Sequence, residues 1–599
     1  MERRYILAIA LMIIVMVSWT IFFSPPPPEQ TPDREREDSP TSPSESTTET
    51  PTPTQREGSS LYLRRDHESP RTLVQTDNYD ISFVEEKAIV EEWRLRKYPD
   101  RSGNDESINL IPKSAQSCLR VKIPDLENDT MSAVWKADKQ QVILTNQPRD
   151  KLTFKTQIGD KLKVSKEFTF YQDRYFVDVA LTLENISNQP LENYQLYWGP
   201  GINADLLLHE RKHSGKGRRA SKNEGAVAYV GHGKPRQDFS ESGKNAPVLW
   251  AGMNSKYFAA LMIPDPSLNA LYEREPLDDN GENPSAEIAA WKDAAKLTIS
   301  GVPANGRRID VFRIYVGPKE DSILNKVTHP NAPDEPLRMN KIIDLGFLWP
   351  VAWAMLWLLR GLNSIIGNYG ISIILLTLFT KLAAYPLIRK SYKSMKEMQE
   401  LQPLLAELKE KYRDDPQKLN RATMRLYKEH GVNPLGGCIP WLPQLPILFA
   451  LFTVFGNAVE LRGAPFCLWM DDLSGPDTLF SLPFTIPLIL TQIDAIRFLP
   501  IIYGVTTLLQ QKMNAGVTPI ADNTQAKIMQ FIPFIFVFIL YNWSSGLILY
   551  WTCSNFFEIG RHLLTQHRKS DETEPVKTLT SGKQSKLTKR RSQLQNRRS

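Results

Sequence analysis

Hydrophobic and polar positions follow different patterns in the two halves of the chain. Through residues 61–340, short alternations of apolar and polar residues are separated by Gly, Pro, Asn and Asp. The segments YFVDVALTLEN (175–185) and RRIDVFRIYVG (307–317) are typical, with every second residue apolar through their central part. A period of two places these side chains on one face of a strand. The pattern predicts a large β-sandwich domain over residues 61–340.

Long apolar runs dominate the second half. They predict five membrane-spanning helices, near residues 370–388, 438–459, 495–513, 527–541 and 544–564. The preceding stretch 345–362 is amphipathic and rich in aromatic residues, which suits a membrane interface. The run 479–492 is broken by two prolines, and a span there would invert the orientation that follows, so we interpret residues 479–494 as an interfacial insertion.

The N-terminus predicts one further span. Residues 1–23 carry Arg3 and Arg4 before an apolar run, and no small-residue cleavage site follows. A cleaved signal peptide is the competing interpretation, but the run is longer than a usual signal core, so we favour an uncleaved anchor. Residues 24–60 are rich in Pro, Ser, Thr and Glu and predict a disordered linker.

The distribution of basic residues orients these spans. Residues 389–430 carry eleven Lys and Arg, and ten more follow residue 567, whereas residues 460–494 carry only Arg462. Positive loops stay in the cytoplasm. We therefore expect both termini in the cytoplasm and the β domain outside it.

Two polar segments belong to the cytoplasmic side of this topology. Leucines at heptad spacing and a DDP break predict a helical hairpin over residues 389–431. Residues 568–599 predict a disordered basic tail, which has two interpretations of equal weight. One is attraction to anionic lipid and the other is attraction to ribosomal RNA.

Composition and motifs exclude several classes of function. The 599-residue chain has a net charge of +6, four widely spaced cysteines, and eight histidines without metal-ligand spacing. Nucleotide-binding and nucleophile motifs are absent from the sequence. We therefore expect no cofactor, no metal and no enzymatic activity. Ser544, Ser545 and Ser554 have no histidine partner within a span, although a Ser–Lys pair with Lys381 stays open as an alternative.

Lys381 is the most unusual residue of the predicted spans, because it lies near the middle of 370–388. A charge at the centre of a bilayer costs about 2.5–3.5 kcal/mol on insertion scales. Snorkelling or an ion pair are structural explanations, yet Glu558 and Asp494 lie near the ends of predicted spans. We favour a water-filled functional cavity.

Neighbouring polar residues support such a cavity. Thr377 shares the face of Lys381, and the other spans contribute Gln444, Thr506 and Gln510. A cation in a wet groove would attract an acidic or polar peptide segment. The apolar neighbour of that segment would then move into lipid, which is favourable by about 25 cal/mol per Å².

Several motifs resemble one known family. They are GISIILLTLFTKLAAYPLIRKSYKSMKEMQELQP (370–403), NPLGGCIPWLPQLPILFALF (433–452), VELRGAPFCLWMDDLS (459–474), QQKM (510–513), KIMQFIPFIFVF (527–538) and SSGLILYWTCSN (544–555). They closely resemble the YidC/Oxa1/Alb3 membrane protein insertases over about residues 340–565, in the Gram-negative YidC arrangement.

The resemblance implies a polytopic α-helical membrane protein of the cell inner membrane, with an N-terminal anchor and a five-helix insertase core over residues 341–567. It also implies a large periplasmic β-sandwich and a substrate groove open to cytoplasm and lipid. The groove charge of the family falls on Lys381, its threonine on Thr377, and its aromatic pair on Tyr550 and Trp551. The implied partners are nascent membrane proteins, the Sec translocon and ribosomes. A solute channel or transporter with a buried cationic site is the alternative function.

Overall fold

The chain folds into two compact units. The computed structural model describes residues 70–100, 107–112, 118–199, 202, 225–231, 234–236, 246–276, 293–413, 415–432, 441–487, 492–514, 535 and 537–571. The β unit is Met1–Trp349 with Asp414–Pro416 and Gly456–Gly463, and the helical unit is Pro350–Arg413 with Gln417–Phe455 and Ala464–Ser599. The predicted anchor (1–23), linker (24–60) and most of the tail (568–599) lie outside the described residues.

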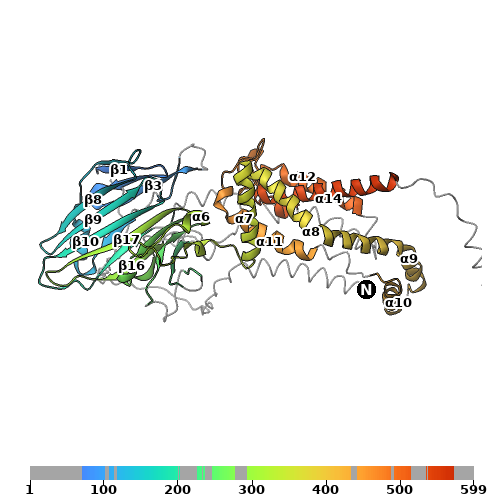
Figure 1. The fold of residues 1–599 in the computed structure, drawn as a ribbon, viewed down its shortest axis with the longest axis horizontal. Coiled ribbons are helices and arrows are strands. Elements are labelled where there is room, and N and C mark those ends of the chain that lie inside the picture. Colours follow the sequence, from blue (N-terminus) through green and yellow to red (C-terminus); the bar gives the residue numbers. More distant parts are fainter. Residues whose placement is uncertain are drawn as a thin grey trace, which may run out of the picture. The chain divides into compact units, whose positions relative to one another are not determined.

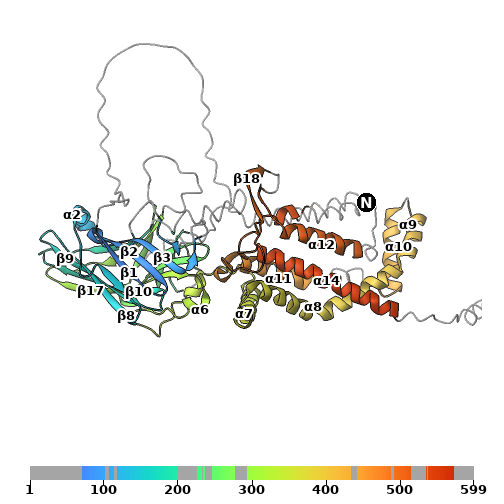
Figure 2. The same cartoon turned by 90° about the horizontal axis from the view of Figure 1, so that it is seen from above.

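Three sheets make up the described part of the β unit (Figures 1 and 2). The five-stranded sheet has the order β4 (Ser107–Asn109), β3 (Ile89–Pro99), β2 (Tyr79–Val84), β1 (Arg71–Gln75), β7 (Gln141–Ile143). The eight-stranded sheet has the order β12 (Gly225–Tyr229), β13 (Trp250–Asn254), β14 (Phe258–Pro264), β17 (Arg307–Pro318), β10 (Phe176–Asn185), β9 (Leu162–Tyr171), β8 (Arg149–Ile158), β6 (Lys136–Ala137). The four-stranded sheet has the order β15 (Leu271–Pro276), β16 (Asp293–Ser300), β11 (Asn193–Trp198), β5 (Arg120–Lys122).

Short helices connect these strands. They are η1 (Glu85–Lys87), η2 (Pro124–Leu126), α2 (Glu127–Ser132), η3 (Pro266–Leu268), α6 (Asp321–Leu324) and η4 (Met339–Ile342). The β unit also contains η6 (Val459–Leu461), which follows the helical segment 441–457 in the chain. Val459 is buried in the core of the β unit, so a segment distant in sequence is part of this domain.

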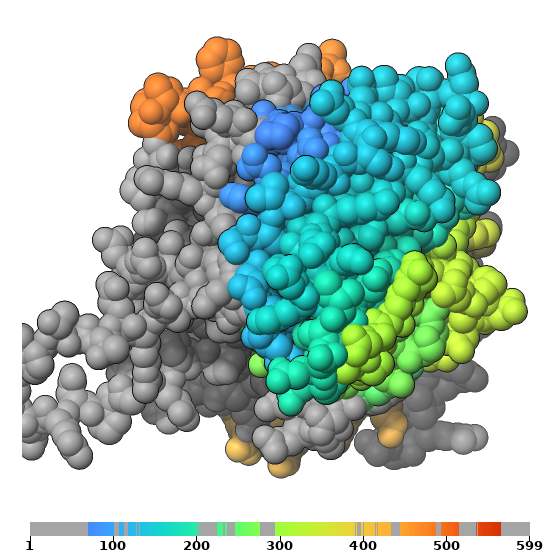
Figure 3. Space-filling model, turned by 90° about the vertical axis from the view of Figure 1, so that its left-hand side faces the viewer, coloured from blue at the N-terminus to red at the C-terminus, as the bar shows by residue number. Residues whose placement is uncertain are grey.

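Apolar side chains of facing sheets form the core of the β unit. The predicted alternation of β10 is confirmed, because Val177, Val179, Leu181 and Leu183 are each at most 5% exposed. Phe83 of the five-stranded sheet contacts Phe154 and Phe168 of the eight-stranded sheet, with ring centroids 5.3 and 5.0 Å away. Strands β8, β9 and β10 present their outer residues as a broad cyan face in Figure 3. A β-sandwich, as the alternation predicted, is the architecture of this unit.

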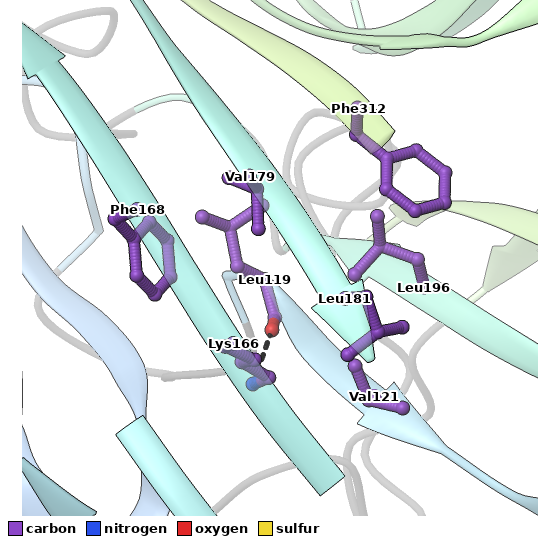
Figure 4. A pocket seen from close by; sticks show the side chains of 8 residues that line it. All are labelled: Leu119, Val121, Lys166, Phe168, Val179, Leu181, Leu196 and Phe312. Atoms are coloured by element: carbon purple, nitrogen blue, oxygen red, sulfur yellow. Dashed lines mark hydrogen bonds between the residues drawn. The ribbon is translucent and has the colours of Figure 1, made fainter. Parts of the chain in front are cut away.

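Lys166 is the most deeply buried lysine among the described residues of this sandwich. Lys166 of β9 is 2% exposed and lines a small cavity with Leu119, Val121 and Phe168 (Figure 4). Its ammonium donates hydrogen bonds to the carbonyl oxygens of Ala88 (3.0 Å) and Leu119 (2.9 Å). Burial, with a smaller contribution from the positive charge of Arg120, lowers the pKa of Lys166 to about 7.

We therefore expect the β unit to become more stable as the pH rises from about 7 to about 10. The unfolded chain holds the Lys166 proton up to the ordinary pKa of 10.5, whereas the folded chain releases it near pH 7. The unfolded state then binds more protons, so the free energy of unfolding rises by up to about 1.4 kcal/mol per pH unit, and this contribution is constant below that window. Urea unfolding of the detergent-solubilised chain at several pH values would measure it.

Two variants separate this effect from other titrations. The free energy of unfolding of Lys166→Met is compared with that of the wild type at each pH. The difference between the two should change as the pH rises from about 7 to about 10. In Lys163→Met, which alters an exposed residue of the same strand, that difference should stay flat. Parallel wild-type and Lys166→Met curves would contradict the prediction.

Helices dominate the other unit. The described helices are α7 (Trp349–Ile366), α8 (Tyr369–Glu400), α9 (Gln402–Lys411), α10 (Pro416–Glu429), α11 (Trp441–Asn457), α12 (Leu499–Asn514) and α14 (Ser545–Asp571). Helix α14 packs against both α12 and α8 (Figure 2). Residues of the predicted interfacial insertion (479–494) fall in an antiparallel hairpin, β18 (Phe480–Pro487) and β19 (Gln492–Ile496).

The number of membrane spans is not confirmed. Among the described residues, one stretch, Tyr369–Arg389 of α8, is long and apolar enough to cross a membrane, with a mean hydropathy of 1.9. The apolar stretch Gln444–Asn457 of α11 is shorter. Most of the predicted span 527–541 lies outside the described residues. Exposed Trp353 and Trp357 on α7 match the aromatic character predicted for 345–362.

Candidate functional site

Lys381 forms an ion pair with Glu558. The ammonium of Lys381 on α8 lies 3.3 Å from Oε1 of Glu558 on α14, and the two side chains are 18% and 16% exposed. The structure thus has the internal pair that the sequence analysis ranked below a water-filled cavity. The predicted span at 544–564 put Glu558 near its end. Helix α14 continues to Asp571 instead, so Glu558 lies in the middle of the helix.

Glu558 has a second cationic partner on its own helix. Its other oxygen, Oε2, accepts from Nη2 of Arg561 at 2.8 Å and from Nε at 3.2 Å. The spacing of three residues brings both side chains to one face of α14. These three groups together carry two positive charges and one negative charge.

Tyr550 connects polar residues of three helices. Its hydroxyl lies 3.4 Å from Oγ1 of Thr380 on α8 and accepts from Nε2 of Gln444 on α11 at 3.4 Å. Tyr550 is fully buried, which is why the hydroxyl requires polar partners. Sequence reasoning named Tyr550 and Gln444 but missed Thr380, whose signal was its position directly before Lys381.

Thr377 has a structural contact in this arrangement. Its side chain is fully buried and donates to the backbone carbonyl of Ile373 at 2.7 Å. Thr380 likewise donates to the carbonyl of Thr377 at 2.8 Å. These bonds keep hydroxyls satisfied inside an apolar helix, because each finds an acceptor within the same helix.

A second polar cluster joins α12 to α14. Asn555 donates to Thr506 at 3.1 Å and to Thr507 at 2.9 Å. Gln510 lies one turn after Thr506 on α12 and is half-buried. Interhelical bonds of this kind hold helices together in lipid. Gln510 therefore lies one helical turn beyond the contact between Asn555 and Thr506.

Trp551 is the half-buried member of the predicted aromatic pair. Its ring stacks on Tyr503 of α12 at 5.8 Å and on Trp543 at 6.2 Å. Trp543 in turn contacts Phe452 of α11 at 4.6 Å. Tyr550 and Trp551 are adjacent in sequence but point to different neighbours, since Tyr550 contacts α8 and α11 and Trp551 contacts α12.

The segment 464–475 closes the N-terminal ends of α8 and α14. Asn368 donates to the carbonyl of Phe466 at 3.2 Å, and Gly546 donates its backbone N–H to Leu473 at 2.9 Å. Gly370 lies under Phe466, where a Cβ would come within 2.0 Å of the ring. The absence of a side chain at Gly370 therefore allows this close packing.

A buried arginine fixes the start of α12. Arg497 is 0% exposed and donates to Asp494 at 2.8 Å and to the carbonyl of Tyr541 at 3.0 Å, besides a hydrogen bond to Asn542. Asp477 caps α12 by accepting from the backbone N–H groups of residues 498 and 499 at 2.9 and 2.8 Å. Sequence reasoning placed Arg497 inside a span without assigning it a role.

The described residues contain no group of three or more His, Cys, Asp or Glu that could hold a metal ion. The polar residues of the candidate site lie on α8, α11, α12 and α14.

Comparisons with known proteins match almost the whole described chain. The family model of the 60Kd inner membrane protein matches residues 361–572, and that of the YidC periplasmic domain matches residues 71–358. The Membrane protein insertase YidC of Syntrophus aciditrophicus is 32% identical over 82% of this chain and 83% of its own. The proteins of the same name from Geobacter sp. and Pelobacter propionicus are 31% and 29% identical, covering 82% and 94% of this chain and 84% and 98% of their own.

Proposed function

Because this chain belongs to the YidC family and is a membrane protein insertase of the inner membrane with a periplasmic β-rich domain, we propose that Lys381 and its polar neighbours form its substrate groove. The groove residues are Lys381, Thr377, Gln444, Thr506, Gln510, Tyr550 and Trp551. The family is not one of catalytic enzymes, so the groove changes where a segment of substrate lies and makes or breaks no covalent bond.

The observation that carries this proposal is the Lys381–Glu558 pair between α8 and α14. Charged groups within apolar helices are costly and face the protein interior or a wet cavity. Mutual neutralisation lowers the cost, and because Glu558 is also paired with Arg561, the ammonium of Lys381 can contact an acidic partner. A hydrophilic substrate segment with acidic or polar groups is therefore favoured there.

The bonds at the N-terminal ends of α8 and α14 support one direction of transfer. Segment 464–475 is bonded across the starts of α8 and α14, which disfavours a continuous polar path at that end. The substrate then enters from the cytoplasm, and its apolar part moves sideways into lipid past Tyr550 and Trp551. Burial of this apolar part in lipid drives the transfer at about 25 cal/mol per Å².

The proposed topology has an N-terminal anchor, five core spans and both termini in the cytoplasm. The asymmetry of basic residues supports it, because residues 389–430 carry eleven Lys and Arg. Helices α9 and α10 belong to this segment and form the cytoplasmic hairpin of the proposal. The proposed partners are ribosomes bearing nascent membrane proteins, the Sec translocon, and anionic lipids at the basic tail.

Site-specific photocrosslinking tests the groove. We expect a photoreactive residue at position 551, which is half-buried, to crosslink a ribosome-bound nascent chain, and positions 377 and 550 to do so once the helices separate. The matched control is position 357, an exposed residue of α7 that is not one of the groove residues.

The pattern of crosslinks decides the outcome. Strong crosslinks at 551 with none at 357 support the groove. Equal crosslinking at 551 and 357 would show only general contact with lipid-borne substrate and would contradict it.

A further inference from the structure

The carboxylate of Glu558 is shared unequally between two cations. Arg561 contacts Oε2 through two nitrogens, at 2.8 and 3.2 Å, whereas Lys381 contacts Oε1 through one contact of 3.3 Å. Two charge-assisted hydrogen bonds from one guanidinium to the same carboxylate oxygen hold it more firmly than a single ammonium contact of 3.3 Å. Glu558 is therefore held mainly by Arg561, and its contact with Lys381 is the weaker of the two.

Loss of the Lys381 contact would leave Glu558 neutralised. Arg561 is three residues away on the same helix, so this pair survives any separation of α8 from α14. The ammonium of Lys381 can then take another carboxylate without leaving an unpaired negative charge in the apolar interior. Breaking most buried pairs is costly because one charge is left alone, and Arg561 removes that cost here.

We propose that Glu558 is a resident counter-ion, which a carboxylate of the incoming hydrophilic segment displaces from Lys381. The inference rests on the proposed groove function and deepens it by giving Glu558 a role, which is to compete with an acidic substrate segment for Lys381. The favoured segments carry an Asp or Glu at the depth of Lys381. Segments that bring only Lys or Arg are disfavoured, because they bring no carboxylate that could replace Glu558.

The proposal assigns opposite effects to the two partners of Lys381. Removing Glu558 leaves Lys381 without its resident partner, so an acidic substrate no longer has a competitor. Removing Arg561 leaves Glu558 with Lys381 alone, so the resident pair tightens and the acidic substrate competes less well. Both residues act through Lys381 and are positioning residues.

The test uses the full-length protein in proteoliposomes and two matched substrates. One substrate carries a single Asp in its short hydrophilic segment, and the other carries Asn at the same position. The measured quantity is the ratio of insertion of the Asp substrate to the Asn substrate. Each variant is also checked for its unfolding midpoint in detergent, so that misfolding is detected separately.

We expect Glu558→Gln to raise this ratio by about fivefold and Arg561→Gln to lower it by a similar factor, the size of a partly exposed ion pair. The double variant Lys381→Gln/Glu558→Gln should abolish the preference. A ratio that is unchanged in Glu558→Gln and Arg561→Gln while total insertion falls would show a purely structural role and overturn the inference.

The same experiment distinguishes failure of the groove itself. If Lys381→Gln leaves the Asp-to-Asn ratio of the wild type unchanged, the electrostatic groove is wrong as well. If Lys381→Gln abolishes the ratio but Glu558→Gln and Arg561→Gln do not change it, only the counter-ion role is wrong.

Discussion

Replacing Lys381 with alanine should reduce insertion of substrates with a short acidic hydrophilic segment about tenfold or more. The variant removes the cation among the proposed groove residues and leaves Glu558 paired with Arg561, so an acidic segment loses its partner at this depth. A charge-assisted contact in a partly desolvated site contributes about 1.5–3 kcal/mol, and about 1.4 kcal/mol is already tenfold. Reconstituted insertion with a protease-protection readout measures the effect.

Two variants at the same position serve as controls. Lys381→Arg keeps the charge and should be tolerated, because a guanidinium can also contact Glu558. Lys381→Gln keeps most of the volume without the charge and should behave like Lys381→Ala. Normal insertion by Lys381→Ala would refute the electrostatic mechanism but not the membership of the family, which rests on the whole chain.

Replacing Arg497 with alanine should lower the free energy of unfolding of the helical unit by about 3 kcal/mol. The guanidinium is completely buried and contacts Asp494 and the carbonyl of Tyr541. Removing one partner of a buried pair leaves the others without compensation, which costs about 3–5 kcal/mol, and the partial exposure of Asp494 moves the value to the lower end. Denaturant unfolding in detergent measures the change.

Lys512 provides the matched control for this prediction. It is an exposed basic residue at the other end of α12, so Lys512→Ala should change stability by less than about 0.5 kcal/mol. Arg497→Lys keeps the charge but not the geometry and should fall between the two. An Arg497→Ala variant as stable as Lys512→Ala would show that the buried network does not hold the start of α12.

Periodicity and motif similarity predicted much of the architecture. The alternation in 175–185 marked β10, because one face of that strand is buried and the other is not. The apolar run at 370–388 marked the part of α8 that is long enough to span a membrane. Of the predicted groove residues, the structure joins Tyr550 with Gln444 directly and places Thr506 on α12 against α14.

Contacts between distant elements were less accessible to sequence reasoning. Lys381 is the thirteenth residue of α8 and Glu558 the fourteenth of α14, and the same segment is bonded to the starts of both helices. At about 1.5 Å per residue the two side chains reach nearly the same depth. That coincidence depends on where each helix begins, and helix ends are the least certain part of a prediction from sequence.

Buried polar networks were missed for a different reason. Arg497 and Asp477 satisfy backbone groups of a helix start and of Tyr541, and no local pattern specifies such partners. Arg497 is 44 residues away from Tyr541, and Asp477 is 21 and 22 residues away from the two backbone N–H groups. Helix or strand periodicity does not extend over such separations. Only the folded arrangement shows that an arginine within an apolar run has acceptors on several sides.

The bonds between segment 464–475 and the starts of α8 and α14 bear on two requirements of an insertase in an energised membrane. The insertase has to admit polypeptide, and it has to keep protons and other small ions from leaking across. Gly370 lets the ring of Phe466 lie directly against α8, and Gly546 lets the backbone of Leu473 lie directly against α14, so this end resists separation of the helices. Helices that are bonded together at one end can still separate at the other. Polypeptide can enter at that other end, while the bonded end still blocks protons and other small ions. We therefore expect the transmembrane potential to survive each round of insertion.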